Sequence, residues 1–330
     1  MSHSKRHAGI ARRALLLLAA CCGIAAAPAR AQDYPVRPIK LIVPNPPGGV
    51  TDLLGRIVSE RLGALYRQPV VVDNRSGASG HVGAQQVARS PADGYTLLLG
   101  TIGIHSAYAS YRKLGYDPST ELVPVTILAE SPNVVLVPVD SPLHSFGELL
   151  AKAKADPAGL NYATAGPGSS VHMVTALFET ISGAKVNYVP YKGSGPAMVD
   201  LIGGQVQVMF ENLPSAMPHI QSGRVRALAV TGNRRDPRLP KVPTIAESGL
   251  PDYAAYSWFT VAVPRGTPQP VVDQLSRDLK RVLAAPEVVA QLDKLGATQV
   301  LNSPAQAQKF IQAETVKWTR VIQATKLQLD

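Results

Sequence analysis

The sequence has little cysteine, few aromatic residues and few charges for its length. Of its 330 residues only 2 are cysteines, 5% are aromatic and 17% are charged. Both cysteines, Cys21 and Cys22, lie near the amino terminus. The rest of the chain therefore has no thiol for catalysis, for a disulfide or for a metal site. Hydrophobic residues make up 45% of the chain, which excludes a disordered or fibrous protein.

Long apolar runs are also missing, because no segment after residue 31 reaches the roughly 18 residues of a membrane-spanning helix. At the amino terminus, basic residues precede a short apolar stretch, Ala14 to Ala27, and a small-residue ending, Ala29-Arg30-Ala31. This order is typical of a secretory signal peptide over residues 1–31. Leu18-Ala19-Ala20-Cys21 also has the form of a lipobox, which would leave Cys21 lipidated. We expect a periplasmic protein in either case.

The formal net charge of +10 falls by half once the signal is removed. Residues 1–31 contain five basic residues and no acidic one, so 28 basic residues remain against 23 acidic ones, or +5. That excess suits a receptor for anionic solutes better than a nucleic-acid binder. The basic, proline-rich segment Asp236 to Pro243 is predicted to be a solvated loop rather than a nucleic-acid contact.

Sequence patterns of common catalytic and metal sites are missing as well. The run Gly166-Pro167-Gly168-Ser169-Ser170 lacks the spacing of the Gly-x-Ser-x-Gly elbow of hydrolases. No phosphate-binding loop or dinucleotide fingerprint is present. The five histidines after residue 31 show no paired spacing, so a zinc site has little support. We predict neither a metal nor a cofactor.

Past residue 32, short β-branched runs alternate with amphipathic stretches, which is an α/β pattern. Helix starts are marked by Ser145 with Glu148 and by Ser303-Pro304 with Gln306. Trp318 is predicted to be core, because it lies on an apolar stripe of the last helix. The predicted strands are Lys40–Val43, Val70–Val72, Thr96–Leu99, Val134–Val137, Leu160–Ala163, Val186–Val189, Val206–Phe210, Arg226–Val230 and Phe259–Val263.

Two glycine turns, one in each half of the chain, carry most of the functional information. Each follows a predicted strand and opens a predicted helix: Pro46 to Asp52 (PPGGVTD) and Ala165 to His172 (AGPGSSVH). Free N–H groups at a helix start, together with the helix dipole, form an anion site. A simpler alternative is that the glycines make tight turns and that Thr51, Asp52, Ser169 and Ser170 are helix caps. Capping is the expected role of Asp52, because its carboxylate would repel an anion.

Two further glycine turns, Arg75 to Gly83 and Tyr191 to Gly195, also lie between a strand and a helix. Their serines could donate hydrogen bonds, whereas Lys192 is expected to be a solvated loop residue. His172 follows the second glycine turn and could approach a ligand, although packing or capping is the commoner role.

Several runs of the sequence together resemble a known family. The runs that carry the resemblance are DYPVRPIKLIVPNPPGGVTD, QPVVVDNRSGASGHVGAQQVARSPADGYTLLLG, VPYKGSGPAMVDLIGGQV, LAVTGNRRDPRLPKVPTIAESGLPDY, and Trp258 with VPRGTP. In this order they are similar to the Bug (TctC-type) family of periplasmic solute-binding proteins, which serve tripartite tricarboxylate transport systems. The resemblance covers essentially all of the chain after the signal.

The resemblance implies a type II periplasmic-binding-protein fold, in which two α/β domains joined by crossover strands close on a ligand. We expect domain 1 at residues 32–130 plus 256–330, and domain 2 at 131–255. The family's two carboxylate-holding loops match the two glycine turns, and Glu211, which follows a predicted strand, is expected to line or border the cleft. The expected ligand-binding residues are Pro47, Gly48, Gly49, Val50, Thr51, Asp52, Ala165, Gly166, Gly168, Ser169, Ser170, His172 and Glu211.

The predicted function is capture of a small organic carboxylate and its delivery to a membrane permease, without chemistry, by a monomer that binds no nucleic acid. Three alternatives remain at this stage. One is an exported α/β hydrolase or isomerase using Ser170 with His172. Another is a solute receptor that feeds a membrane sensor. The third, the sensing half of a transcription regulator, is disfavoured by the signal peptide and by the lack of a helix-turn-helix segment.

Overall fold

The computed structural model describes residues 34–329, so the predicted signal peptide and Cys21 lie outside the described residues. From Arg37 onward the chain forms one compact unit. Its strands are β1 (Ile39–Val43), β2 (Val70–Asn74), β3 (Thr96–Thr101), β4 (Leu122–Pro138), β5 (Asn161–Thr164), β6 (Asn187–Pro190), β7 (Val208–Asn212), β8 (Val225–Val230), β9 (Tyr256–Pro264) and β10 (Thr298–Gln299).

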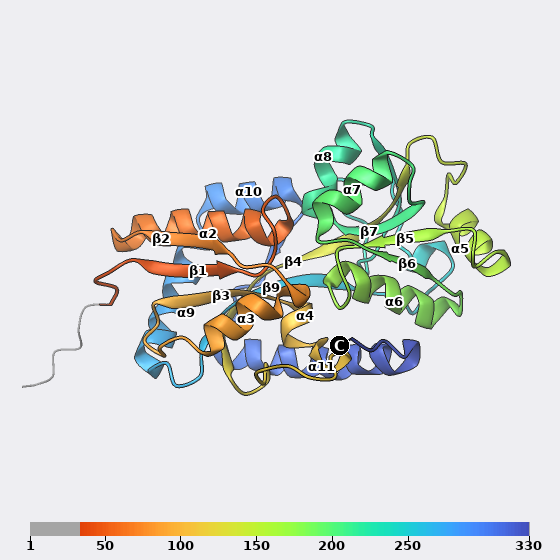
Figure 1. The fold of residues 1–330 in the computed structure, drawn as a ribbon. Helices are drawn as coiled ribbons and strands as arrows, with labels where there is room; N and C mark the ends of the chain where they lie inside the picture. Colours follow the sequence, from red (N-terminus) through yellow and green to blue (C-terminus); the bar gives the residue numbers. More distant parts are fainter. Residues whose placement is uncertain (1–33, 330) are drawn as a thin grey trace, which may run out of the picture. The chain divides into compact units, whose positions relative to one another are not determined.

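Helices cover both faces of the sheet, as predicted for an α/β protein (Figure 1). They are α2 (Val50–Tyr66), α3 (His81–Ala88), α4 (Ile102–His105), α5 (Phe146–Ala155), α6 (Ser170–Ser182), α7 (Ser194–Ile202), α8 (Leu213–Gln221), α9 (Gln269–Leu283), α10 (Pro286–Leu295) and α11 (Pro304–Thr325). Single 3₁₀ turns are η1 (Ala78–Gly80), η2 (Tyr108–Ser110) and η3 (Ala246–Ser248).

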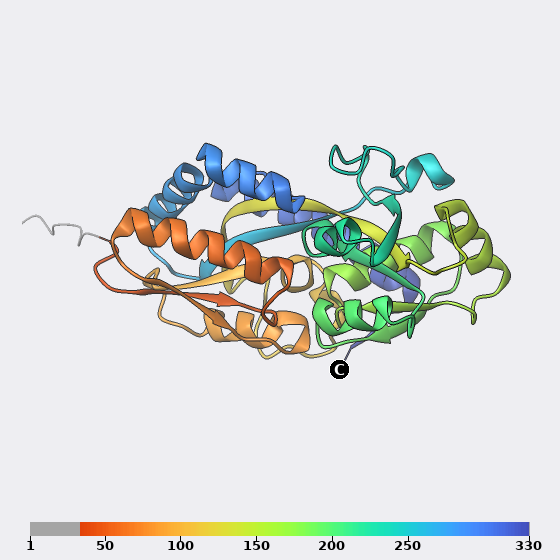
Figure 2. The same ribbon diagram turned by 90° about the horizontal axis from the view of Figure 1, so that it is seen from above.

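The strand order β2-β1-β3-β9-β4-β7-β5-β6 places one parallel group of strands at each end of a single sheet, with β9 and β4 between the two groups. In the first lobe, which we define by β1, β2 and β3 and the helices between them, β1 pairs in parallel with both neighbours. In the second lobe, which we define by β5, β6 and β7 and the helices between them, β5 pairs in parallel with β6 and β7. Figure 2 shows the two lobes side by side, linked by β4 and β9.

The linking strands β4 and β9 run antiparallel to each other. The first part of β4, Leu122 to Pro132, pairs with β9, and its last part, Asn133 to Pro138, pairs with β7 and β8. The sequence prediction placed a strand only over the last part, because Pro124, Pro132 and polar residues interrupt the apolar pattern of the first. It also missed the two-residue strand β10. The exact domain boundaries stay a prediction.

Predicted helix starts are confirmed where side chains cap them. Ser145 accepts a hydrogen bond from the N–H of Glu148, and Ser303 forms a capping box with Gln306. In α2, Gly55 lets the helix approach β1 closely, because a Cβ at this position would lie 2.7 Å from Cγ2 of Val43.

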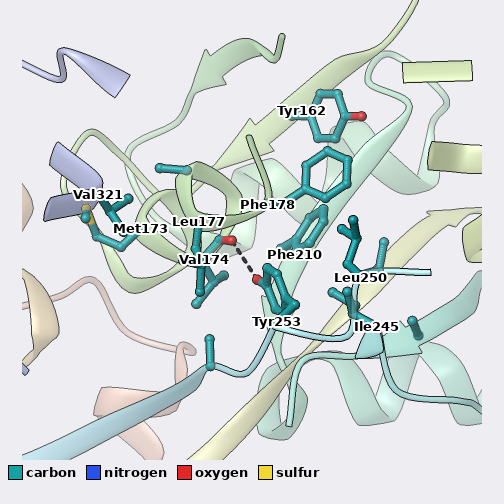
Figure 3. Packing of buried hydrophobic residues seen from close by; sticks show 14 of the residues in the cluster. Tyr162, Met173, Val174, Leu177, Phe178, Phe210, Ile245, Leu250, Tyr253 and Val321 are labelled. Atoms are coloured by element: carbon teal, nitrogen blue, oxygen red, sulfur yellow. Dashed lines mark hydrogen bonds between the residues drawn. The ribbon is translucent and has the colours of Figure 1, made fainter. Parts of the chain in front are cut away.

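A large apolar core underlies the second lobe (Figure 3). The rings of Tyr162, Phe178 and Phe210 pack together, and the Tyr253 hydroxyl donates to the carbonyl of Val174 at 2.7 Å. Val321 of α11 joins the same cluster, so the last helix packs against this core.

Trp318 is fully buried in α11, which confirms the prediction that it belongs to the core. Glu314 interrupts the apolar stripe of that helix because it is a hydrogen-bond partner of two buried tryptophans. Its carboxylate accepts from the indole N–H of Trp318 at 2.7 Å and from that of Trp258 at 2.9 Å.

Candidate ligand-binding cleft

Two adjoining cavities, together called the cleft, lie at the carboxyl ends of strands from both lobes. The larger has about 530 Å³ and the smaller about 80 Å³. The residues common to both walls include Asn45 and Ser79 from the first lobe and Ala165 and Gly193 from the second. The cleft is therefore built where ligands bind in open α/β sheets, beyond the carboxyl ends of the strands.

Three helices begin at the smaller cavity. The N-cap residues of α2 and α7, Gly49 and Gly193, have no side-chain cap. The first N–H groups of each helix point along its axis with partial positive charge. None of the described residues that line the cleft has an acidic side chain. The helix-start residues in the wall of the smaller cavity are Val50 and Thr51 of α2, Ser170 and Val171 of α6, and Ser194 and Gly195 of α7.

Asp52 organises the turn before α2 and does not line the cleft. Its buried carboxylate accepts from the N–H of Gly48 at 3.1 Å, from Nε of Arg56 at 3.0 Å and from Nδ2 of Asn74 at 3.1 Å. Burial alone would raise the pKa of this carboxyl, but the hydrogen bonds outweigh burial and lower its pKa. Asp52 therefore holds the turn before α2 instead of capping the N–H groups of the helix, and its donors compensate for the carboxylate charge.

The turn before α6 is held by Ser169 and His172. Ser169 Oγ accepts from the N–H of His172 at 3.2 Å, and Nδ1 of His172 accepts from the N–H of Gly168 at 2.9 Å. Because Nδ1 is an acceptor, a neutral ring carries its proton on Nε2. Burial lowers the pKa of His172 to about 4, so the ring is neutral at pH 7.

These contacts leave no catalytic pair at the start of α6. His172 uses Nδ1 for the Gly168 N–H and packs edge-on against Tyr188 at 4.5 Å between ring centroids. The hydroxyl oxygen of Ser170 accepts a hydrogen bond from Nδ2 of Asn212 at 3.5 Å. Among the described contacts, no hydrogen bond joins Ser170 to His172.

Glu211 lies behind the smaller cavity and is completely buried. Its Oε1 accepts from the N–H of Asn212 at 2.9 Å, from Nδ2 of the same residue at 3.2 Å, and from Ser215 Oγ at 2.6 Å. Burial raises the pKa of the Glu211 carboxyl despite these donors. Among the described residues nothing bonds its Oε2 or the Oδ1 of Asn212. Asn212 lines the cleft, so Glu211 positions it from behind.

The loop after β2 brings the lobes together across the cleft. Gly77, Ala78, Ser79 and Gly80 all have positive φ, which turns the Ser79 hydroxyl toward the second lobe. There it donates to the carbonyl of Pro167. The position of Gly80 favours glycine, because a Cβ there would lie 3.0 Å from Cβ of Pro44 and its φ is 99°. The hydrogen bond from Ser79 to Pro167 links the two lobes across the cleft.

The wall of the larger cavity combines one charged side chain with apolar, glycine and small polar residues. Lys192 is the single residue with a charged side chain among the described residues that line the cleft. Its neighbour Tyr191 donates its hydroxyl to Asp200 at 2.7 Å. Burial and then the Asp200 carboxylate raise the pKa of Tyr191 to about 12, so the hydroxyl stays protonated. Lys192 is exposed, as expected, yet it also borders the cavity.

The structure separates the predicted site residues into two groups. Those that line the cleft are Pro47, Gly49, Val50, Thr51, Ala165, Gly166, Ser169 and Ser170. Those that do not line it are Gly48, Asp52, Gly168, His172 and Glu211. Members of the second group support the turns through hydrogen bonds, as Gly48 does with Asp52 and Gly168 with His172.

Sequence reasoning left other lining residues outside the predicted site. For Ser79 and Lys192 a signal existed, because both lie in glycine turns between a strand and a helix. For Tyr111, Phe259 and Leu329 no local signal exists, because only the tertiary structure brings their segments to the cleft.

Across residues 34–329, no helix has both the length and the apolar character needed to cross a membrane. Within the same part of the chain, no group of three His, Cys, Asp or Glu side chains could hold a metal ion.

A two-domain α/β fold with helix starts from both lobes facing one cleft defines a solute-binding receptor of the periplasmic type. The family model described as "Tripartite tricarboxylate transporter family receptor" matches residues 54–327, and the chain belongs to this family. Protein BugT of Bordetella pertussis is 41% identical over 312 residues, which cover 94% of this chain and 95% of that protein. The predicted family and fold are confirmed, and the protein is a receptor rather than an enzyme.

Solved structures of related proteins share the fold of this chain over most of its length. Rpa4515 of R. palustris, solved with adipate, has a TM-score of 0.86 and 41% identity, and the match covers 88% of this chain and 98% of that one. MatC of Rhodopseudomonas palustris, solved with bound malate, has a TM-score of 0.81 and 32% identity, covering 88% of this chain and all of the other. The periplasmic binding protein BugD has a TM-score of 0.84 and 34% identity, covering 89% and 99%.

Proposed function

We propose that the protein captures a small organic carboxylate and delivers it to a membrane transporter of the tripartite tricarboxylate type. The observation that carries this proposal is the convergence of three helix starts on a cavity whose described lining has no acidic side chain. A carboxylate there would accept hydrogen bonds from the N–H groups at the starts of α2 and α6 and from nearby hydroxyls. Ordered water would bridge the remaining gaps.

The contact residues follow from this placement. Gly49, Val50 and Thr51 would hold the carboxylate from the first lobe, and Ser169 and Ser170 from the second. The remaining predicted site residues would act as neighbours or supports: Pro47, Gly48, Asp52, Ala165, Gly166, Gly168, His172 and Glu211.

The larger cavity leaves room for the rest of the ligand. Its volume of about 530 Å³ lies in the range typical of small-molecule sites. Lys192 at its border would attract a second carboxylate, so a dicarboxylate is the best fit. Two relatives support this ligand class, because Rpa4515 was solved with adipate and MatC with malate.

Isothermal titration of the protein without residues 1–31 tests the ligand class. We expect saturable binding of at least one dicarboxylate from a panel that includes malate, succinate and adipate. Glucose and magnesium chloride serve as the non-acid probes. Binding of a non-acid together with failure of every acid would overturn the proposal.

The protein would work in the periplasm as a monomer after removal of residues 1–31. The chain belongs to a family of periplasmic binding proteins, and this membership supports a periplasmic location. Intact-mass measurement of the exported protein distinguishes cleavage after Ala31 from a lipoprotein that begins at Cys21. Light scattering on a size-exclusion column would report its oligomeric state.

Delivery to a permease is tested in cells. Deleting the gene should abolish uptake of the acid identified by titration, and a plasmid copy should restore it. Unchanged uptake, together with loss of a transcriptional response to the acid, would instead favour a receptor that feeds a membrane sensor.

A further inference from the structure

Residues 326–329, here called the strap, follow α11 and reach the cleft. After α11 ends at Thr325, Lys326 takes a left-handed conformation, with φ of 54°, and the chain turns away from the helix axis. Leu329 then pairs with η2 and the residues after it. Its N–H donates to the carbonyl of Ser110 at 2.6 Å, and its carbonyl accepts from the N–H of Arg112 at 2.9 Å. Figure 1 shows this end of the chain near α4.

The strap connects the two lobes. The helix α11, from which it extends, packs on α6 and shares the core of the second lobe. The residues that it pairs with, Ser110 and Arg112, lie in the connection between β3 and β4 on the first-lobe side. The backbone of Leu329 is therefore held in place independently of its side chain.

The side chain of Leu329 forms part of the wall of the larger cavity. It also contacts the second glycine turn, because a Cβ placed on Gly168 would lie 3.3 Å from Cδ1 of Leu329. A further cavity of about 360 Å³, here called the rear cavity, is lined by Leu329 and Pro167 as well. These two residues are common to both cavities and so separate them.

The lining of the rear cavity mixes apolar and polar residues. Tyr188, Pro190 and Leu327, with the ring of His172, would contact a hydrocarbon chain, and the polar members are Thr164, Thr325, Lys326 and Gln328. His172 is buried and uses Nδ1 for the Gly168 N–H, so it offers a neutral aromatic surface there. An extended ligand that passed Leu329 would gain apolar contact at its far end.

We propose that Leu329 is a specificity-determining residue whose side chain sets the maximum length of the ligand. It closes the larger cavity at the end that borders the rear cavity. This inference rests on the proposed function, since it assigns a length limit to the carboxylate bound in the cleft. Removing the side chain would extend the larger cavity toward the rear cavity and leave Pro167 at their boundary, while the backbone pairing with Ser110 and Arg112 remains.

Titration of linear dicarboxylates with four to ten carbons tests the length limit. We expect wild-type affinity to rise with chain length to an optimum and then to fall. In Leu329→Ala the optimum should move to acids at least two methylenes longer, with about a fourfold gain for each methylene newly buried. Leu329→Phe should move the optimum to shorter acids. Both variants should keep the wild-type melting temperature, because Leu329 is partly exposed.

Val316→Ala is the matched control, because it shortens an apolar side chain that is 54% exposed on α11. Its length profile should match that of wild type. If wild type binds dicarboxylates but both Leu329 variants keep its length profile, the inference is wrong and the proposed function stands. If wild type binds no acid in either panel, the proposed function fails and the length limit fails with it.

Discussion

Two buried carboxylates lie behind the cleft, and their surroundings shift their pKa values in opposite directions. Asp52 accepts from a guanidinium, a backbone N–H and a side-chain amide, so its pKa is lowered although burial opposes this. Glu211 is completely buried, and burial raises its pKa although hydrogen bonds from Ser215, Ser194 and Asn212 oppose this. The same functional group is thus stabilised as an anion at one helix start and disfavoured as an anion at another.

Asp52→Asn should lower the free energy of unfolding at pH 7 by about 1–2 kcal/mol, because charge-assisted hydrogen bonds become neutral ones. The lowered pKa of Asp52 gives stability that is present above its unfolded value of about 4 and is lost as the pH falls through the folded value. The deficit should therefore shrink below pH 4 in urea unfolding. The control Arg56→Ala removes an exposed partner and should cost less than about 0.5 kcal/mol. Equal stability of Asp52→Asn and wild type at pH 7 would contradict this role.

Glu211→Gln should have the opposite dependence on pH. A raised pKa means that stability is fully present below the unfolded value and is lost as the pH rises through the folded value. The variant cannot ionise, so it should gain on wild type as the pH rises from 4 to 8. Each unit by which the pKa is raised corresponds to about 1.4 kcal/mol. Thermal unfolding across this range measures the difference, and parallel curves for the two proteins would refute the assignment.

The helices α2 and α6 both begin at the cleft but differ in how their first turns are capped. The sequence predicted both starts from glycine turns that follow strands. Ser169 is the N-cap of α6, as expected, whereas the N-cap of α2 is Gly49 and no side chain caps it. An uncapped start keeps its N–H groups available for a ligand, which fits the place of Gly49 in the cleft wall.

Two serine caps with the same geometry separate helix stability from ligand binding. Ser169 in α6 and Ser145 in α5 each accept a backbone N–H at 3.2 Å. Replacing either with alanine should cost about 1 kcal/mol of stability. Only Ser169→Ala should also weaken acid binding, since Ser145 does not line the cleft. Titration of both variants with the same acid decides this, and equal affinities would remove Ser169 from the site.

For the protein as a whole, three buried histidines couple stability to acid. His81, His105 and His172 are each almost fully buried. Burial lowers the pKa of His81 to about 4, of His105 to about 3 and of His172 to about 4. His81 also bonds the Tyr116 hydroxyl through Nδ1 at 2.8 Å. All three are therefore neutral in the folded protein at pH 7.

Acid should destabilise the folded protein through these histidines before the carboxyl groups of ordinary or lowered pKa titrate. A histidine with a lowered pKa contributes stability above its unfolded value of about 6.5, and this stability is lost as the pH falls toward the folded value. At pH 5 the expected loss is about 2 kcal/mol for each group. Urea unfolding at pH 7.5 and pH 5 measures it. His105→Gln should reduce this pH dependence, whereas the exposed control His144→Gln should leave it unchanged; equal slopes for all three proteins would contradict the explanation.

The local sequence was sufficient for the α/β class, most strands, the capped helices and the two glycine turns. Periodicity, capping residues and glycines act over a few neighbouring positions, so a single chain reveals them. The first part of β4 escaped because prolines and polar residues interrupt its pattern, although pairing with β9 makes it a strand.

Which residues face the cleft was decided only by the tertiary structure. Asp52 and His172 lie within the predicted turns, yet hydrogen bonds to Gly48 and Gly168 turn them to support those turns from behind. Leu329 reaches the cleft through backbone pairing with Ser110, more than two hundred positions away. Contacts at such separations depend on how the lobes and the last helix pack, and no short-range pattern encodes them.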